Sequence, residues 1–424
     1  MKKVFFPYGK EKMSFEFGDE LVGVLTSGIE EYKPLCDERE LVKKAMENPI
    51  GSAPLYELAK GKDKVVIIAS DHTRPVPSKI IMPLMLQEIR EGNPEADITI
   101  LISTGCHRGT TEEELVNKFG REIVENEKIY IHDCDERDML VCIGKLPSGG
   151  DCEVNKLAIE ADLLVSEGFI EPHFFAGFSG GRKSVLPGVA SRATVLANHC
   201  SEFIADPKSR TGVLEGNPIH KDMLWAAKQA KLVYIVNVVL DAEKKIIYAV
   251  AGDLEKAHKQ GTDFLSSLCG VEPIEADIAI TTNGGYPLDQ NVYQAVKGMT
   301  AAEATVKDGG VIIMLAKSND GIGGDEFYKQ LSQPDLSKTM QMFLSRDRSQ
   351  TAPDQWQTQI LLRILLSHTV IYVSEMPDEV IAKMNMIPAH SIGEAISRAK
   401  EIIGKEEAKI VAIPDGIGVM VVKK

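Results

Sequence analysis

The chain has 424 residues, of which 44% are hydrophobic and 26% are charged, and its formal net charge is −14. A chain of this length exceeds one compact core and predicts two domains. The acidic balance argues against a nucleic-acid-binding protein, which needs a basic face. No apolar run reaches the ~20 residues of a membrane span, so no membrane association is expected. Seven cysteines without a CxxC pair predict reduced thiols and a cytoplasmic location.

Apolar, β-branched segments alternate with helical patterns in the first part of the chain. Strands are expected at Lys64–Ser70, Asp97–Ser103, 161–166 and Leu232–Leu240. The sequence TTEEEL predicts a helix start, with Thr110 or Thr111 as the N-cap. This alternation predicts a mostly parallel sheet that is covered by helices on both faces.

A second set of strands begins near residue 275. Its expected strands are 277–282, 310–316, 369–374 and 409–414, with a helix at 391–403. The predicted fold class is therefore α/β, with two Rossmann-like α/β domains at residues 1–270 and 275–424. Ligands of open parallel sheets bind beyond the carboxyl ends of the strands. Because the candidate residues of both domains follow strands, the active site is expected in an interdomain cleft.

The segment 171–188, EPHFFAGFSGGRKSVLPG, resembles a phosphate-binding P-loop but departs from it. Lys183 and Ser184 fit the motif, whereas Arg182 stands where its second glycine belongs. We therefore expect a cationic, glycine-rich loop that is not built for ATP. His173 and His199 flank Lys183 in the sequence, which suggests covalent or metal chemistry. The neighbouring cation of Arg182 would favour a more nucleophilic lysine amine.

Two further loops follow the first strands. In DHTRPVP, Arg74 offers a planar fork for a carboxylate or phosphate, and the alternative is a structural ion pair between Asp71 and Arg74. His107, in STGCHRG, either meets a ligand or bonds to the nearby backbone. His173 is either a general base or a hydrogen-bonded core residue.

The second domain contributes NVYQAVKGM after a glycine turn. Tyr293 and Gln294 each share a helix face with Lys297, which suits a carboxylate; the alternative is a solvated amphipathic helix. His199 lies in ATVLANHC, and the chain has no HxH or HExxH motif, so a closed zinc site is not expected.

Five motifs in the order DHTRPVP, STGCHRG, EPHFFAGFSGGRKSVLPG, ANHC and VYQAVKGM resemble the nickel-dependent lactate racemase family along the whole chain. The resemblance implies nickel and a pincer cofactor, pyridinium-3,5-bisthiocarboxylic acid mononucleotide, attached covalently to Lys183. It implies that His199 is the nickel ligand, and that cofactor biosynthesis proteins are partners. Soft sulfur together with imidazole suits Ni(II).

The same resemblance implies roles for the remaining candidates. His107 and His173 match the two catalytic histidines, and Arg74 and Lys297 match carboxylate-binding positions. The matching supporting positions are Asp71, Tyr293 and Gln294, and Trp356 matches a tryptophan to which no role is assigned. The first domain would then carry the cofactor and both histidines, and the second would contribute substrate-binding residues.

The implied reaction is the interconversion of D- and L-lactate. Removing the α-hydrogen as a proton would create a dianion beside the carboxylate. The expected route is instead hydride transfer to and from the pincer cofactor, with the two histidines as alternating acid and base. Three alternatives stay open. They are a racemase or epimerase of another small 2-hydroxy acid, a P-loop-like nucleotide-binding enzyme, and a non-catalytic nickel or cofactor carrier.

Overall fold

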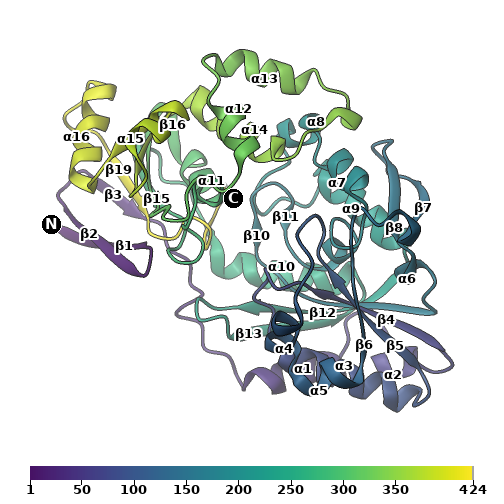
Figure 1. The fold of residues 1–424 in the computed structure, drawn as a ribbon. Helices are drawn as coiled ribbons and strands as arrows, with labels where there is room; N and C mark the ends of the chain where they lie inside the picture. The colour runs from purple at the N-terminus through teal and green to yellow at the C-terminus, as the bar shows by residue number, and fades with distance from the viewer. Residues whose placement is uncertain (423–424) are drawn as a thin grey trace. The chain divides into compact units, whose positions relative to one another are not determined.

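A computed structural model describes residues 1–422, and the chain divides into two compact units, each with its own six-stranded sheet (Figure 1). The Lys183 unit comprises Ile29–His199 and Lys208–Leu268. The Lys297 unit comprises Met1–Gly28, Cys200–Pro207 and the chain from Cys269 onward. Residues 1–28 and 200–207 were expected in the first domain, whereas the structure places them in the Lys297 unit.

The Lys183 unit is built on a sheet with the strand order β13-β12-β9-β4-β5-β6. All neighbours are parallel except β12 and β13, which form an antiparallel pair. The strands are β4 (Lys64–Ser70), β5 (Asp97–Ser103), β6 (Lys128–Ile131), β9 (Leu163–Phe169), β12 (Leu232–Leu240) and β13 (Ile246–Gly252). Two short hairpins accompany them, β7 (Leu140–Lys145) with β8 (Asp151–Asn155), and β10 (Pro172–His173) with β11 (Gly177–Phe178).

Helices cover both faces of this sheet, as expected. Those of the Lys183 unit are α1 (Glu38–Glu47), α2 (Leu55–Leu58), α3 (Ser78–Gly92), α4 (Glu112–Phe119), α5 (Arg121–Asn126), α6 (Lys156–Ile159), α7 (Arg192–Asn198), α9 (Pro218–Gln229) and α10 (Lys256–Cys269). Figure 1 shows α1, α3 and α5 along one face and α9 and α10 toward the other. The predicted cap is confirmed, because Thr111 accepts a hydrogen bond from Glu114 in a capping box.

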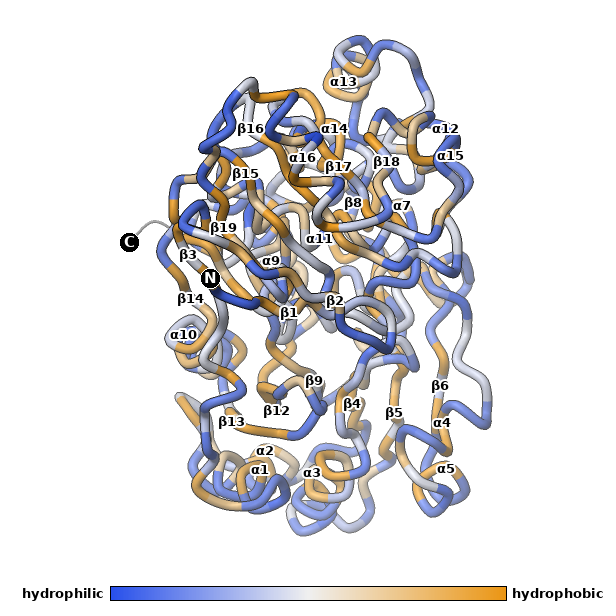
Figure 2. The backbone as a smooth tube through the Cα atoms, turned by 90° about the vertical axis from the view of Figure 1, so that its left-hand side faces the viewer, coloured by the Kyte–Doolittle hydropathy of each residue, from blue (hydrophilic) through white to orange (hydrophobic). Residues whose placement is uncertain are grey.

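The central strands are mostly hydrophobic, as Figure 2 shows for β4, although β9 contains Ser166 and Glu167 and β12 contains Asn237. On β9, Leu163, Val165 and Phe169 face a core that α1, α2 and α3 complete. A parallel strand that is buried on both faces requires this continuous apolar composition, which is why these segments could be recognised in the sequence.

The sheet of the Lys297 unit has the order β18-β17-β16-β15-β19-β3, with every neighbouring pair parallel. Its strands are β3 (Leu21–Val24), β15 (Ala276–Thr282), β16 (Val306–Leu315), β17 (Thr369–Val373), β18 (Ile387–Ala389) and β19 (Ile410–Ile413). Its helices are α8 (Ser201–Ala205), α11 (Val292–Glu303), α12 (Asp325–Leu331), α13 (Leu336–Leu344), α14 (Gln355–Ser367), α15 (Asp378–Lys383) and α16 (Ile392–Ile403). A short parallel pair joins β14 (Gly270–Val271) to β20 (Met420–Val421).

The N-terminal segment belongs to this second sheet because of its apolar side chains. β1 (Lys2–Tyr8) and β2 (Glu11–Phe17) form a hairpin whose Phe6 and Phe17 are buried in one core with Ile278 and Ile280. β3 then pairs with β19 from the far end of the chain. Sequence reasoning missed this pairing because nothing local to β3 identifies so distant a partner.

Both sheets reverse their strand order at one point. In the Lys183 unit the chain runs outward from β4 to β5 and β6 and returns to β9 on the other side of β4. In the Lys297 unit, β15 has the same position between β16 and β19. Ligands of such sheets bind where the strand order reverses, beyond the carboxyl ends of the strands. Among residues 1–422, no helix is long and apolar enough to cross a membrane.

Candidate active site

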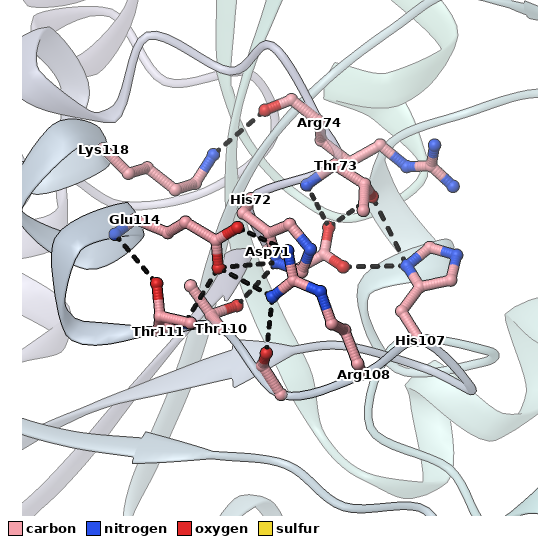
Figure 3. A network of polar contacts seen from close by, with 11 residues as sticks. Asp71, His72, Thr73, Arg74, His107, Arg108, Thr110, Thr111, Glu114 and Lys118 are labelled. Atoms are coloured by element: carbon pink, nitrogen blue, oxygen red, sulfur yellow. Dashed lines mark hydrogen bonds and ion pairs between the residues drawn. The ribbon is translucent and has the colours of Figure 1, made fainter. Parts of the chain in front are cut away.

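The loops after β4 and β5 bring Asp71 and His107 into contact. Nδ1 of His107 lies 2.7 Å from Oδ2 of Asp71, and the Asp71 side chain is 1% exposed whereas that of His107 is 44% exposed (Figure 3). An ionised carboxylate only accepts hydrogen bonds, so Nδ1 of His107 carries the proton and donates it. In that tautomer Nε2 has the lone pair and is the basic atom of the ring.

Thr73 completes the environment of this carboxylate. Its backbone N–H and its Oγ1 donate to Oδ1 of Asp71 at 3.2 and 2.7 Å. Burial raises the pKa of Asp71, but the hydrogen bonds from His107 and Thr73 outweigh it and hold the pKa below its usual value. The buried carboxylate is therefore ionised at neutral pH and orients the imidazole.

Arg74 projects from the same loop. Its side chain is exposed, and within residues 1–422 its guanidinium makes no ion pair or hydrogen bond. In Figure 3 the guanidinium and the His107 ring extend to the same side of Asp71. The alternative of a structural ion pair between Asp71 and Arg74 is therefore wrong, because Asp71 pairs with His107.

His173 lies in the tight hairpin formed by β10 and β11, where it pairs with Gly177. The backbone N–H of Ala176 donates to its Nδ1 at 3.3 Å, so the neutral ring carries its proton on Nε2. Phe174 stacks on the ring at 5.1 Å between centroids, and Phe175 meets it edge-on at 4.5 Å. The aromatic side chains give this imidazole an apolar setting.

Lys183 lies in the 3-10 turn Gly181–Ser184, and both Gly180, directly before the turn, and Gly181, its first residue, have positive φ. A side chain on Gly180 would meet Oδ1 of Asn237 at 2.7 Å, so the loop requires glycine there. A P-loop precedes a helix whose N-terminus binds phosphate, whereas Lys183 belongs to a single turn of four residues. This geometry argues against the nucleotide-binding alternative.

Arg182 points into the interior. Its guanidinium donates to the carbonyls of Ala176, Ser179 and Gly180 at 2.8, 3.4 and 3.3 Å and lies beside His258. Burial lowers the pKa of Arg182 to about 9, which leaves it charged at neutral pH. Arg182 therefore holds the loop between His173 and Lys183 from beneath.

His199 caps the C-terminus of α7 and is 6% exposed. Its Nδ1 lies 3.0 Å from the carbonyl oxygen of Val195, to which it donates, so Nε2 has the lone pair. Burial, and then the charge of Lys183, lower the pKa of His199 to about 3. The ring is therefore neutral, it lies close enough to Lys183 to sense its charge, and Phe175 packs edge-on against it at 5.1 Å.

In the Lys297 unit, the three candidates lie on α11. Asn291 caps the helix by accepting from the backbone N–H of Gln294 at 2.9 Å. Tyr293, Gln294 and Lys297 are all half-buried, and Tyr293 and Gln294 each share a helix face with Lys297. That this face meets the residues of the Lys183 unit stays a prediction.

Sequence reasoning left Trp356 without a role and missed Asp354. Both lie at the start of α14, and both side chains hydrogen-bond to the Tyr293 hydroxyl. Asp354 has a φ of 61°, which is uncommon for a residue other than glycine. The signal available in the sequence was weak, because aspartate adopts this conformation more readily than most residues and TAPDQW otherwise resembles an ordinary turn.

Comparisons with known proteins agree along the whole chain. A family model described as the lactate racemase N-terminal domain matches residues 8–212, and the lactate racemase C-terminal domain matches residues 271–421. A curated lactate racemase from Thermoanaerobacterium thermosaccharolyticum is 55% identical, with 100% of each chain covered. Another, from Lactiplantibacillus plantarum, is 54% identical over 99% of this chain and 100% of its own.

Solved structures give the same result. The lactate racemase apoprotein from Thermoanaerobacterium thermosaccharolyticum matches with a TM-score of 0.96 and 54% identity, with both chains fully covered. A protein from Thermotoga maritima matches with a TM-score of 0.65 and 19% identity over 91% of this chain and 99% of its own, which shows a shared fold alone.

The class of protein defined by this fold and these matches is an α/β enzyme of the isomerase type. The chain belongs to the lactate racemase family.

Proposed function

We propose that this protein interconverts D- and L-lactate. Two curated relatives that match at full length are named lactate racemase, which supports lactate over other small 2-hydroxy acids. The observation that carries the proposal is the contact of 2.7 Å between His107 and the buried Asp71, because it presents a histidine oriented as a base at the end of a strand.

The two histidines are held in opposite tautomers. His107 donates from Nδ1 to Asp71, so its Nε2 accepts a proton; His173 accepts at Nδ1 from Ala176, so its Nε2 donates one. A racemase that treats both enantiomers alike needs a base for the hydroxyl of one and an acid for the alkoxide of the other. In our proposal His107 takes the hydroxyl proton of one enantiomer and His173 returns a proton to form the other, and the roles exchange in the reverse direction.

The residues around Lys183 fit a nickel pincer nucleotide. A histidine ligand is neutral and usually donates its second ring N–H to a carbonyl, as His199 does to Val195. Lys183, whose charge acts on His199, is the proposed point of covalent attachment. When bound, the cofactor would accept and return the hydride of the substrate carbon. Supplying it would require partner proteins that synthesise it.

The substrate carboxylate would be bound by Arg74 and Lys297. The guanidinium of Arg74 makes no hydrogen bond or ion pair within residues 1–422, and an exposed guanidinium next to the oriented His107 suits a small carboxylate. Lys297 would supply the second charge, with Tyr293 and Gln294 supporting it from the same helix face. Fixing the carboxylate at two points would orient the reacting carbon, which contributes much of the rate in such enzymes.

The proposal is tested on protein made in a host that synthesises the cofactor. Peptide mass spectrometry should find a nucleotide-sized adduct on Lys183, with nickel bound at about one per chain. His107→Ala and His173→Ala should each abolish lactate racemisation while the adduct stays in place. Near wild-type turnover by either variant would remove that histidine from the mechanism.

A panel of 2-hydroxy acids distinguishes the remaining alternatives. Faster turnover of a longer 2-hydroxy acid than of lactate would keep the chemistry and change the substrate. Cofactor loading without turnover of any substrate would favour a carrier. An unmodified Lys183 from a host that loads a known lactate racemase would contradict the proposal as a whole.

A further inference from the structure

Glu167 is a charged residue in the middle of a strand that is buried from end to end. β9 reads LLVSEGF, and all of its residues are buried, Glu167 at 2% exposure. Burying a carboxyl group costs several kcal/mol unless it is hydrogen-bonded, so a glutamate at this position needs a reason. Nothing in the sequence pattern or in the proposed reaction uses it.

The contacts of Glu167 lie at the two ends of one loop. Oγ of Ser78, the first residue of α3, donates to its Oε1 at 2.6 Å. The backbone amide of Ser70, the last residue of β4, faces the same carboxyl group. The seven residues between these two points carry Asp71 and Arg74. One buried side chain therefore connects the start and the end of the loop that holds them.

Lys118 connects the middle of the loop to the same group. It extends from α4, and its Nζ donates to the backbone carbonyl of Arg74 at 3.2 Å (Figure 3). Its charge acts on Glu167 and on Asp71, and burial lowers the pKa of Lys118. The loop is thus held at its beginning, its centre and its end by two side chains that lie behind it.

Glu167 contacts the two ends of the loop through hydrogen bonds. Burial raises its pKa, and this effect outweighs the opposing effects of Lys118, Ser78 and Ser70. Its second oxygen, Oε2, has no hydrogen-bond partner. A glutamine has the same shape and keeps an oxygen that accepts from Ser78, so Glu167→Gln should preserve the hydrogen bond to the loop. Glu167→Leu should lose this hydrogen bond.

We propose that Glu167 is a positioning residue that fixes both ends of the loop at residues 71–77 and thereby sets the positions of Arg74 and of the Asp71–His107 pair. This inference rests on the proposed lactate racemase function for the roles of Arg74 and His107. The contact between Asp71 and His107, however, can be observed without any activity.

The test compares Glu167→Leu with Glu167→Gln and with a matched control, Glu88→Leu. Glu88 is a half-buried carboxyl on α3 whose pKa burial raises, and its Oε2 also has no partner. It contacts the backbone amides of Tyr56 and Leu55 rather than the loop. Both leucine variants remove from the same unit a carboxyl group whose Oε2 has no partner, so an effect that comes only from a general loss of stability should appear in both.

The first measurement uses the apoprotein. The imidazole 15N chemical shifts of His107, assigned by their loss in His107→Gln, report which ring nitrogen carries the proton. We expect Glu167→Leu to move these shifts toward a mixture of tautomers, and Glu167→Gln and Glu88→Leu to keep the wild-type values. Wild-type shifts in Glu167→Leu, or an equal change in Glu88→Leu, would overturn the proposal.

The second measurement uses the loaded enzyme. Glu167→Leu should raise KM for both lactate enantiomers by about tenfold or more, with nickel per chain unchanged, since Lys183 and His199 lie in other loops. The KM of Glu167→Gln should stay within about threefold of the wild-type value. If the KM of Glu167→Leu equals that of Glu88→Leu, Glu167 does not have the proposed positioning role. Should Glu167→Leu not fold, Ser78→Ala removes the 2.6 Å bond together with the longer 3.5 Å contact of Oγ with the Val76 carbonyl, and should raise KM by a few-fold. If the loaded wild-type enzyme does not racemise lactate, the proposed function is refuted. The 15N comparison on the apoprotein would still decide the role of Glu167.

Discussion

Replacing Asp71 by asparagine should reverse the tautomer of His107. In the native site Oδ1 of Asp71 accepts two hydrogen bonds from Thr73, while Oδ2 accepts one from His107. An asparagine keeps one acceptor oxygen and replaces the other with an NH₂ donor. Turning the NH₂ toward Thr73 would lose two hydrogen bonds of about 1 kcal/mol each, so we expect it to face His107.

His107 then has to accept at Nδ1, which places its proton on Nε2 and removes the base. The variant also loses the negative charge that stabilises the imidazolium. Two unit charges about 4 Å apart interact by about 4 kcal/mol at an effective dielectric constant of 20. Together these effects should lower kcat by about 10²- to 10⁴-fold, equivalent to about 3–5 kcal/mol of transition-state stabilisation.

The assay is the initial rate from each lactate enantiomer with enantiomer-specific detection of the product. Thr73→Val is the control: it removes the Oγ1 bond but keeps the carboxylate and its bond to His107, and should cost no more than about tenfold. The imidazole 15N shifts of the apoprotein show the tautomer directly. Racemisation by Asp71→Asn within about threefold of wild type, or retention of the Nδ1–H tautomer, would refute the reasoning.

Three further predictions concern the scaffold. Arg182→Met removes a buried donor from three loop carbonyls; those of Ser179 and Gly180 keep His258 and the Lys183 amide as donors, whereas that of Ala176 loses its hydrogen bond. The substitution should lower the free energy of unfolding by about 1–3 kcal/mol, and an unchanged thermal midpoint would contradict this. Gly188→Ala places a Cβ 2.2 Å from the Ser184 carbonyl oxygen and should cost about 1–3 kcal/mol, whereas the control Gly109→Ala, whose nearest neighbour would be 3.8 Å away, should be nearly neutral by denaturant titration. Burial raises the pKa of Asp277, but hydrogen bonds, the strongest from Lys405, outweigh it and lower that pKa to about 2. The stabilisation is present above the unfolded pKa of about 3.9 and is lost as the pH falls through the folded pKa of about 2. Asp277→Asn should therefore cost about 1–2 kcal/mol at neutral pH, after allowance for solvent screening, and nothing well below pH 2. A pH-independent difference would be the contrary result.

Local patterns in the sequence were sufficient for the strands and for the helix starts. The bounds of β4, β5 and β12 agree with their apolar runs, because a buried parallel strand must be apolar on both faces. Thr111 was one of two expected caps, because a hydroxyl before a run of carboxylates satisfies the first amides of a helix. The five motifs likewise predicted the family, which the comparisons confirmed.

The long-range partners could not be derived in this way. The sequence allowed Asp71 to pair with Arg74, which is near it in the chain, whereas the structure pairs Asp71 with His107 from the next strand. Arg182 was expected to act on its neighbour Lys183, and its guanidinium instead donates to carbonyls of the loop that leads to Lys183. Sequence spacing describes which residues can be neighbours along an element, and it says little about the direction of a side chain in a loop.

The sequence by itself determined the α/β class, the order of the motifs and the residue types available for chemistry, since these depend on local preferences and on composition. Only the tertiary structure decided that residues 1–28 join the sheet of the Lys297 unit, that Asp71 orients His107, and that Glu167 lies behind the loop of Arg74. These features depend on the burial of surfaces that are far apart in the chain. The free energy of that burial becomes defined only when each sheet has formed and has brought together the loops at its own strand ends.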